Sequence, residues 1–127
     1  MTNEIFDKHA ENYSEDIDDT LGKYGASHDF FTRHKAWLIT DILNRCGRDP
    51  KNLKLLDVGC VVGKIHEYLK DDFSQITGID TSRASIEVAK RTYPAIDYRS
   101  YDSTSLPYAD ETFDVSLAIC VFHHVPP

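Results

Sequence analysis

The chain has little of what several large protein classes require. Its cysteines, Cys46, Cys60 and Cys120, are odd in number and lack metal-type spacing. No disulfide framework or metal site is therefore predicted, and a reduced, cytoplasmic location is expected. No apolar run is long enough to span a bilayer, and the charged N-terminal segment does not resemble a signal peptide. Twenty-one acids against 14 lysines and arginines give a net charge of -7, which disfavours a nucleic-acid or anionic-membrane partner.

What the chain does contain is an alternation of strand-like and helix-like segments. Its 127 residues are enough for one domain. Residues 1–27 are polar and mixed and are predicted to form an N-terminal lid segment, followed by a domain over residues 28–127. The predicted strands cover residues 53–58, 75–79, 96–101 and 113–121, and the predicted helices cover residues 28–46, 64–72 and 82–93. Such alternation predicts an α/β fold with an open parallel sheet and flanking helices.

Two of these segments carry a prediction about the core. The helix over residues 28–46 has Ser27 as its expected N-cap and Gly47 as its expected C-cap. Its apolar residues are expected to pack on the sheet, with the aromatic ones in the core: Phe30, Phe31, Trp37, Leu38, Ile42 and Leu43. The segment 113–121 (FDVSLAICV) is nearly continuous in apolar residues, which predicts a central strand.

The most informative run is LLDVGCVVG, residues 55–63. Apolar residues around Asp57 indicate a buried strand, and Gly59 and Gly63 then break it before a helix begins. Glycine lets the backbone approach a ligand closely, and a helix start offers free N–H groups to an anion. A carboxylate at the end of a buried strand needs a partner. The run therefore predicts a turn that cradles a nucleotide-like cofactor.

Two further acids fall at predicted strand ends. Asp80 follows Asp57 by roughly 20 residues, the spacing at which an acid meets the ribose hydroxyls of a bound nucleoside. Asp102 ends the next strand at the same edge of the sheet and could accept a hydrogen bond from an exocyclic amine. Two cofactor classes share this layout. The dinucleotide pattern G-x-G-x-x-G fits at only one of its three glycines, whereas D-x-G-x-G-x-G fits at three of its four positions.

Four segments of the sequence carry a family resemblance. They are IFDKHAENYSEDID, LLDVGCVVGKIHEYL, ITGIDTSRASIEVAKR and YDSTSLPYADETFDVSLAICVFHHV. In this order the chain resembles the class I S-adenosylmethionine-dependent methyltransferases, and within them the small-molecule, methyltransferase type 11 group that includes quinone-biosynthesis enzymes. The resemblance implies a Rossmann-like sheet in the order 3-2-1-4. It also implies methyl transfer from S-adenosyl-L-methionine to a small-molecule acceptor, with S-adenosyl-L-homocysteine as the product.

The resemblance also implies roles for individual residues. Asp57 would hold the methionine amine of the cofactor, Asp80 the ribose and Asp102 the adenine amine. His123 or His124 would open the acceptor site and could serve as a catalytic base. The remaining residues expected to contact the cofactor are Tyr13, Gly59, Cys60, Gly63, Thr81, Ser103, Ile119 and Cys120.

The sequence departs from the family pattern at two points. Val61 stands where the family usually has glycine. The family's sheet has seven strands, whereas the predicted strands end with the fourth. We therefore expect a C-terminally truncated fold whose strand 113–121 is exposed at the sheet edge. Because such an edge favours association, a homodimer formed through it is expected.

Structural alternatives remain for these residues. Asp80 could cap a helix, Asp102 could serve only its turn, Tyr13 could simply pack, and the histidine pair could be structural or solvated. The rival function is a non-catalytic domain that binds S-adenosylmethionine or a nucleoside and has lost its acceptor half. A nicotinamide-dependent oxidoreductase is the weaker rival, because the glycine spacing disfavours it.

Overall fold

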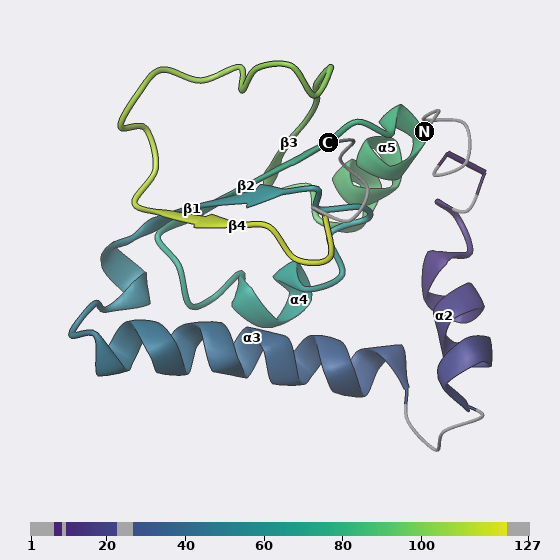
Figure 1. The fold of residues 1–127 in the computed structure, drawn as a ribbon, viewed down its shortest axis with the longest axis horizontal. Coiled ribbons are helices and arrows are strands. Elements are labelled where there is room, and N and C mark those ends of the chain that lie inside the picture. The colour runs from purple at the N-terminus through teal and green to yellow at the C-terminus, as the bar shows by residue number, and fades with distance from the viewer. Residues whose placement is uncertain (1–6, 9, 23–26, 122–127) are drawn as a thin grey trace.

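A computed structural model describes residues 7–8, 10–22 and 27–121 of the chain (Figure 1). The elements in chain order are α2 (Tyr13–Leu21), α3 (His28–Arg45), the short 3-10 helix η2 (Pro50–Asn52), β1 (Lys54–Val58), α4 (His66–Leu69), β2 (Gln75–Asp80), α5 (Arg83–Thr92), β3 (Asp97–Ser100) and β4 (Val115–Leu117). Within the described ranges, no helix has both the length and the apolar character needed to cross a membrane.

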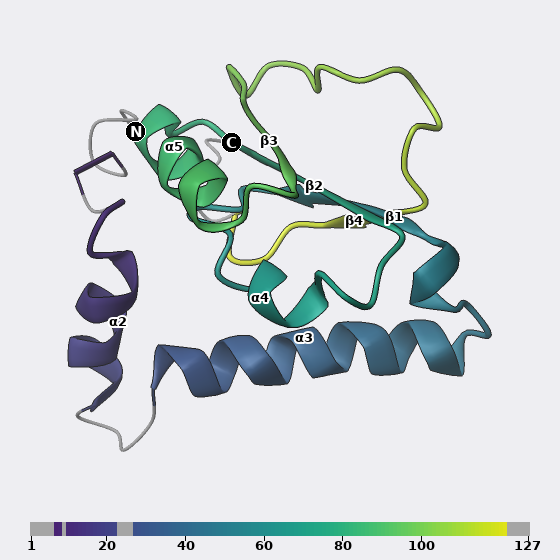
Figure 2. The ribbon, with the colours of Figure 1, turned by 180° about the vertical axis from the view of Figure 1, so that it is seen from behind.

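The four strands form one parallel sheet in the order β3-β2-β1-β4, which confirms the predicted order. All three strand pairs are parallel, so the carboxyl ends of the strands meet at one edge. Figures 1 and 2 show α3 and α4 below the sheet, while the loop between β3 and β4 arches away on the opposite side. The edge at the carboxyl ends is where ligands bind in open α/β folds.

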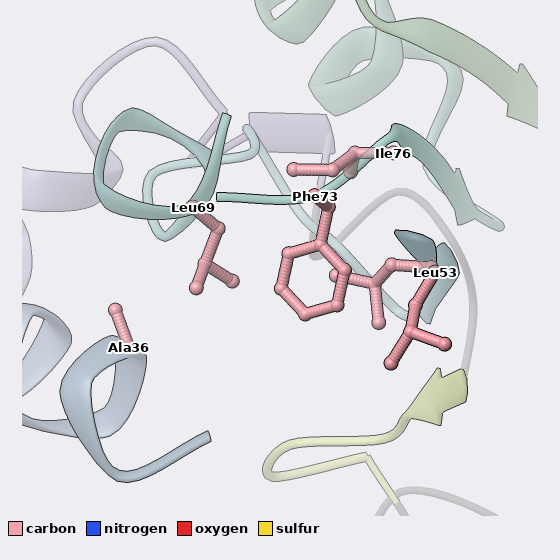
Figure 3. Close-up of a cluster of buried hydrophobic side chains, with 6 residues drawn as sticks. Ala36, Leu53, Leu69, Phe73 and Ile76 are labelled. Atoms are coloured by element: carbon pink, nitrogen blue, oxygen red, sulfur yellow. The ribbon is translucent and has the colours of Figure 1, made fainter. Parts of the chain in front are cut away.

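The main core lies between the sheet and the helices α3 and α4 (Figure 3). Leu55 of β1 and Ile76 of β2 are register partners and therefore face the same side. The buried residues of this cluster are Ala36, Leu53, Leu55, Leu69, Phe73 and Ile76. Leu55 and Leu69 have no exposed surface, so shortening either to alanine would cost about 2–5 kcal/mol of stability.

A second cluster joins β3 to α5. Tyr98 of β3 packs with Ile86 and Ala89 of α5 and with Tyr93, the C-cap of that helix. In the sheet register Tyr98 lies opposite Gly78 of β2. A Cβ at Gly78 would come within 2.7 Å of the Tyr98 ring, so the absence of a side chain there makes room for the ring. With its ring over Gly78, Tyr98 places its hydroxyl next to Gly63, in the turn that follows β1.

The prediction that the aromatic residues of α3 form core was wrong. Phe30 is 63% exposed and Trp37 is 55% exposed, whereas the buried residues of α3 are Thr32 and Ala36. The apolar residues of α3 are spread around the helix, so their spacing does not define a single face. Ile39 and Leu43 are partly buried and pack against the core, so of the predicted apolar residues only Leu43 belongs to it. The predicted N-cap is confirmed, because the Ser27 hydroxyl accepts from the N–H of Phe30 at 3.1 Å. The C-cap is Cys46 and not the predicted Gly47, which follows it in a left-handed conformation with φ +70°.

The prediction of a long central strand over residues 113–121 was also wrong. β4 covers only Val115–Leu117, exposes Ser116 and pairs with β1 alone. It therefore ends the sheet formed by the described residues. Past Leu117 the chain leaves the ladder and forms part of the crevice described below. The helix predicted over residues 64–72 is likewise shorter, because only His66–Leu69 is α-helical.

Gly63 provides a test of the packing under this turn. It has φ +74°, and a Cβ there would overlap the Tyr98 hydroxyl and lie 3.1 Å from Nδ1 of His66. Gly47 has a similar φ of +70° with no atom near the added Cβ. We expect Gly47→Ala to cost about 1 kcal/mol, from backbone strain alone. Gly63→Ala should cost about 3 kcal/mol, because overpacking adds to that strain. Urea unfolding of both variants measures the difference.

The control is the same glycine substitution in a Tyr98→Phe background. Removing the hydroxyl relieves most of the overlap, so Gly63→Ala should cost less there than in the unmodified chain. If Gly63→Ala costs the same free energy of unfolding in both backgrounds, the Tyr98 hydroxyl does not restrict position 63.

Candidate functional site

The turn after β1 is bound to the end of β2 by three hydrogen bonds. The N–H groups of Gly59 and Cys60 both donate to the carbonyl of Ile79, at 2.8 and 3.0 Å. The N–H of Val61 donates to Oδ2 of Asp80 at 2.9 Å. These bonds fix the predicted turn against β2. Asp80, which was predicted to bind a ligand, therefore also holds the turn.

Three residues of this turn, Gly59, Val61 and Gly63, have left-handed backbone conformations. Gly59 has φ +76°, and a Cβ there would come within 2.5 Å of the Val121 side chain. Val61 has φ +52°, which is a strained conformation for a β-branched residue. Such strain persists only where the surroundings impose it. Here the bond from its N–H to Asp80 holds Val61 in place.

Three cavities follow one another along the carboxyl edge of the sheet. The inner cavity, of about 100 Å³, lies at the end of β1 and against α3. The central cavity, of about 620 Å³, adjoins it and shares Tyr13, Gly59, Val61 and Cys120 with it, among other residues. The outer cavity, of about 460 Å³, lies at the end of β3 and shares Thr81 and Tyr101 with the central one. Because neighbouring cavities share wall residues, the three lie in one row along this edge, which is called the crevice below.

The inner cavity brings together most of the residues predicted for one end of the ligand. Those in its wall are Tyr13, Asp57, Gly59, Cys60, Ile119 and Cys120. Sequence reasoning missed three basic residues in the same wall, His28 and Lys35 of α3 and Lys64 before α4. No motif marks His28 and Lys35, because α3 meets the crevice only through packing. Lys64 lies directly after the glycine turn, but its residue type alone did not indicate a role.

His28 has a distinctive environment in this wall. Its ring makes an edge contact with Tyr13, with centroids 5.4 Å apart. Its Nδ1 is buried and has no hydrogen-bond partner among the described residues. Burial lowers the pKa of His28, and nearby Lys35 lowers it further, whereas nearby Asp18 raises it. A neutral ring with a free nitrogen can therefore face the inner and central cavities.

Asp80 lies in the wall of the central cavity, as does Thr81. Its Oδ1 accepts from the N–H of Ser82 at 2.9 Å, in addition to the bond from Val61 to Oδ2. Burial raises the pKa of Asp80, and the two N–H donors partly offset that effect. The helix cap itself is Ser82, whose hydroxyl accepts from the N–H of Ser85. Each carboxylate oxygen still has a free lone pair for a ligand.

Asp102 lines the outer cavity, whereas Ser103 lines none of the three. Oδ1 of Asp102 accepts from the N–H and hydroxyl of Thr104, at 2.9 and 2.6 Å. The Thr104 hydroxyl is also the main cause of the lowered pKa of Asp102. The predicted turn role is therefore present, and Oδ2 is the oxygen left for a ligand. His123 and His124 lie outside the described residues.

Gly63 has a different place from the predicted one. It lines none of the three cavities, and its missing side chain instead leaves room for Tyr98 and His66. Nε2 of His66 lies 2.9 Å from Oδ2 of Asp57. This buried histidine was not predicted. The partner that a carboxylate at this position requires is thus supplied from α4.

Comparisons with known proteins identify the family. The model of a methyltransferase domain matches residues 56–127, which is more than half of the chain and includes the turn, Asp80 and Asp102. The chain belongs to this methyltransferase-domain family. Among curated relatives, a ubiquinone biosynthesis O-methyltransferase of Sinorhizobium fredii is 33% identical over 118 residues, covering 84% of this chain and 47% of the relative. The corresponding protein of Mesorhizobium japonicum is 34% identical, covering 82% and 46%.

Solved structures show the same fold for this methyltransferase domain. A TehB-like SAM-dependent methyltransferase from Corynebacterium glutamicum has a TM-score of 0.61 at 26% identity, covering 87% of this chain and 54% of that one. An amino pentose methyltransferase from Micromonospora echinaspora has a TM-score of 0.66 at 23% identity, covering 76% and 40%, and this likeness bears on the fold alone. The chain spans about half the length of the curated relatives it matches.

The thiols of the methyltransferase domain allow a test of the turn. Cys60 is buried, whereas Cys46 and Cys120 are exposed. Burial, reinforced by the charges of Asp57 and Asp80, raises the pKa of the Cys60 thiol well above its usual value. Because only the thiolate reacts, we expect a thiol reagent at about pH 8 to modify Cys46 and Cys120 rapidly and Cys60 only after unfolding. Colorimetric titration of the native and denatured chain counts the reactive thiols.

A Cys60→Ser variant serves as the control. It should leave the count in the native protein unchanged and lower the count in denaturant by one. Rapid modification of all three thiols in the native protein would contradict the buried position of Cys60.

Proposed function

We propose that this chain is the cofactor-binding part of an S-adenosylmethionine-dependent methyltransferase that acts on a small-molecule acceptor. The observation that carries the proposal is the crevice of three neighbouring cavities at the carboxyl edge. Asp57, Asp80 and Asp102 follow one another along it, at the ends of β1, β2 and β3. The relatives named as ubiquinone biosynthesis O-methyltransferases support an oxygen acceptor on a small molecule.

The residues present suit the charges of this cofactor. S-Adenosylmethionine carries a sulfonium and an ammonium group, both positive. Asp57 and Asp80 are buried and close enough that the charge of Asp57 raises the pKa of Asp80. A cation between them would relieve their repulsion. Lys35 and Lys64, in the wall of the inner cavity, could pair with the cofactor's carboxylate.

We infer a distribution of contacts along the crevice. Asp57 would take the amine at the inner cavity and Asp80 the ribose hydroxyls at the central one. Asp102 would take the adenine amine at the outer cavity. Tyr13, in the walls of the inner and central cavities, would cover the ligand and exclude water.

The chemistry asks little of protein side chains, because the sulfonium that S-adenosylmethionine supplies is already an activated methyl donor. The chain would hold the donor in line with the acceptor and exclude water. An acceptor hydroxyl that loses its proton needs a base. His123 and His124 remain the predicted candidates. His28 joins them, because it lines the same crevice and its Nδ1 has no hydrogen-bond partner among the described residues.

The alternative is a domain that binds the cofactor without transferring its methyl group. Methyl transfer assayed against a panel of hydroxylated small molecules separates the two, since only the enzyme forms S-adenosylhomocysteine. The nicotinamide alternative predicts that NAD binds more tightly than either sulfur ligand.

Asp80 gives the sharpest test of the proposal. We expect S-adenosylhomocysteine to bind the unmodified chain below millimolar, and Asp80→Asn to weaken binding about tenfold or more. The physical reason is that one acceptor oxygen for the ribose becomes an amide donor. Isothermal calorimetry with S-adenosylmethionine, S-adenosylhomocysteine and NAD measures all three affinities.

Asp71→Asn is the matched control, because Asp71 is exposed at the far end of α4. It should bind as the unmodified chain does. Unfolding curves for both variants separate lost binding from lost folding. Failure of both sulfur ligands to bind below millimolar would count against the proposal, whereas unchanged affinity in Asp80→Asn would count only against the ribose assignment.

Self-association and location stay predictions. Among the described strands, none pairs with the outer edge of β4. We predict that two copies associate through this edge and that the protein is cytoplasmic. Static light scattering across a concentration series should show a dimer, and Ser116→Pro, which alters an exposed position of the edge strand, should weaken it. A monomer at every concentration would contradict this prediction.

A further inference from the structure

Three buried side chains form a line of hydrogen bonds behind the inner cavity. Nε2 of His66 lies 2.9 Å from Oδ2 of Asp57, and Nδ1 of His66 lies 2.6 Å from the Tyr98 hydroxyl. The residues are 3%, 0% and 3% exposed for Asp57, His66 and Tyr98. They come from β1, α4 and β3, so the fold brings together groups that are far apart in sequence. Of the three, Asp57 lines the inner cavity.

The pattern of donors and acceptors fixes the protons in this line. Burial raises the pKa of Tyr98, so its hydroxyl keeps its proton. The partner found for that hydroxyl is Nδ1 of His66, which must therefore accept. Nε2 then carries the ring proton and donates it to Oδ2 of Asp57. A doubly protonated ring would leave the Tyr98 proton without an acceptor among the described residues.

Packing holds the His66 ring in this orientation. The rings of His66 and Tyr98 stack with centroids 5.5 Å apart and an interplanar angle of 29°. Gly78 leaves the space for the Tyr98 ring, and Gly63 leaves the space for its hydroxyl. Both rings are buried and stacked on each other, so close packing holds their orientation. The carboxylate of Asp57 is therefore held by a rigid donor.

We propose that His66, fixed by Tyr98, is a positioning residue that orients the Asp57 carboxylate toward the amino group of the cofactor. The bond from His66 occupies Oδ2, which leaves Oδ1 for an ammonium group in the inner cavity. His66 does not line that cavity, so it acts only through Asp57. This inference rests on the proposed function and adds a residue that no motif of the sequence indicates.

The test uses two ligands that differ in the part Asp57 would meet. S-Adenosylhomocysteine carries the amino-acid group, whereas methylthioadenosine has the same adenine, ribose and sulfur without it. Calorimetry with both ligands is run on the unmodified chain, His66→Phe and His66→Gln. Nitrogen-edited NMR of the histidine rings, which needs no ligand, reports which nitrogen of His66 carries the proton.

We expect His66→Phe to weaken the binding of S-adenosylhomocysteine about tenfold or more, because Asp57 loses its charge-assisted hydrogen bond. The affinity for methylthioadenosine should change by no more than about twofold, since this ligand makes no bond to Asp57. His66→Gln should retain much of the affinity for S-adenosylhomocysteine, because its amide can still donate to Asp57. NMR should find the proton on Nε2, and Tyr98→Phe should raise the share of the other tautomer.

Several outcomes would overturn the inference. Equal losses for the two ligands in both His66 variants would mean that His66 only stabilises the fold. A proton on Nδ1 in the unmodified chain would contradict the bond to Asp57, with or without a ligand. If His66→Phe does not fold, His66→Gln and Tyr98→Phe decide the question by the same comparison. An unmodified chain that binds neither ligand would instead refute the proposed function.

Discussion

The site depends on the attachment of the turn after β1 to the end of β2. Three consecutive N–H groups, from Gly59 to Val61, donate to the Ile79 carbonyl and the Asp80 carboxylate. Without these bonds the turn would have no fixed position relative to the neighbouring strand. With them, the walls of the inner and central cavities become parts of one rigid body. The strained backbone of Val61 is a consequence of this attachment, because its N–H must point at Asp80.

A second constraint is the space that glycines leave beneath the turn. Gly63, predicted to contact the ligand, leaves room for the Tyr98 hydroxyl, and Gly78 leaves room for the Tyr98 ring. Tyr98 in turn holds His66, and His66 holds Asp57. Gly63 is thus linked to the Asp57 carboxylate, which lines the inner cavity, through two other side chains. A glycine can matter to a binding site without approaching the ligand.

Much of the fold could be predicted from the sequence because local patterns carry it. The strands at β1, β2 and β3, the cap Ser27 and the sheet order follow from apolar runs, turn residues and family motifs. The errors arose where burial depends on what covers an element. Trp37 is apolar but exposed, because α3 turns Thr32 and Ala36 inward. The segment over residues 113–121 is apolar but is a strand for only three residues.

The sequence by itself determined the type of site: acids at three successive strand ends and a glycine turn between the first two. These features are local, so spacing along the chain was enough to find them. Only the tertiary structure decided which side chains pack against the turn and which residues form the opposite wall of the crevice. Parallel register sets Tyr98 opposite Gly78, and helix packing brings His28 and Lys35 to the crevice. Contacts between residues far apart in the chain leave no periodic signal, because each partner is chosen by the shape of the folded molecule.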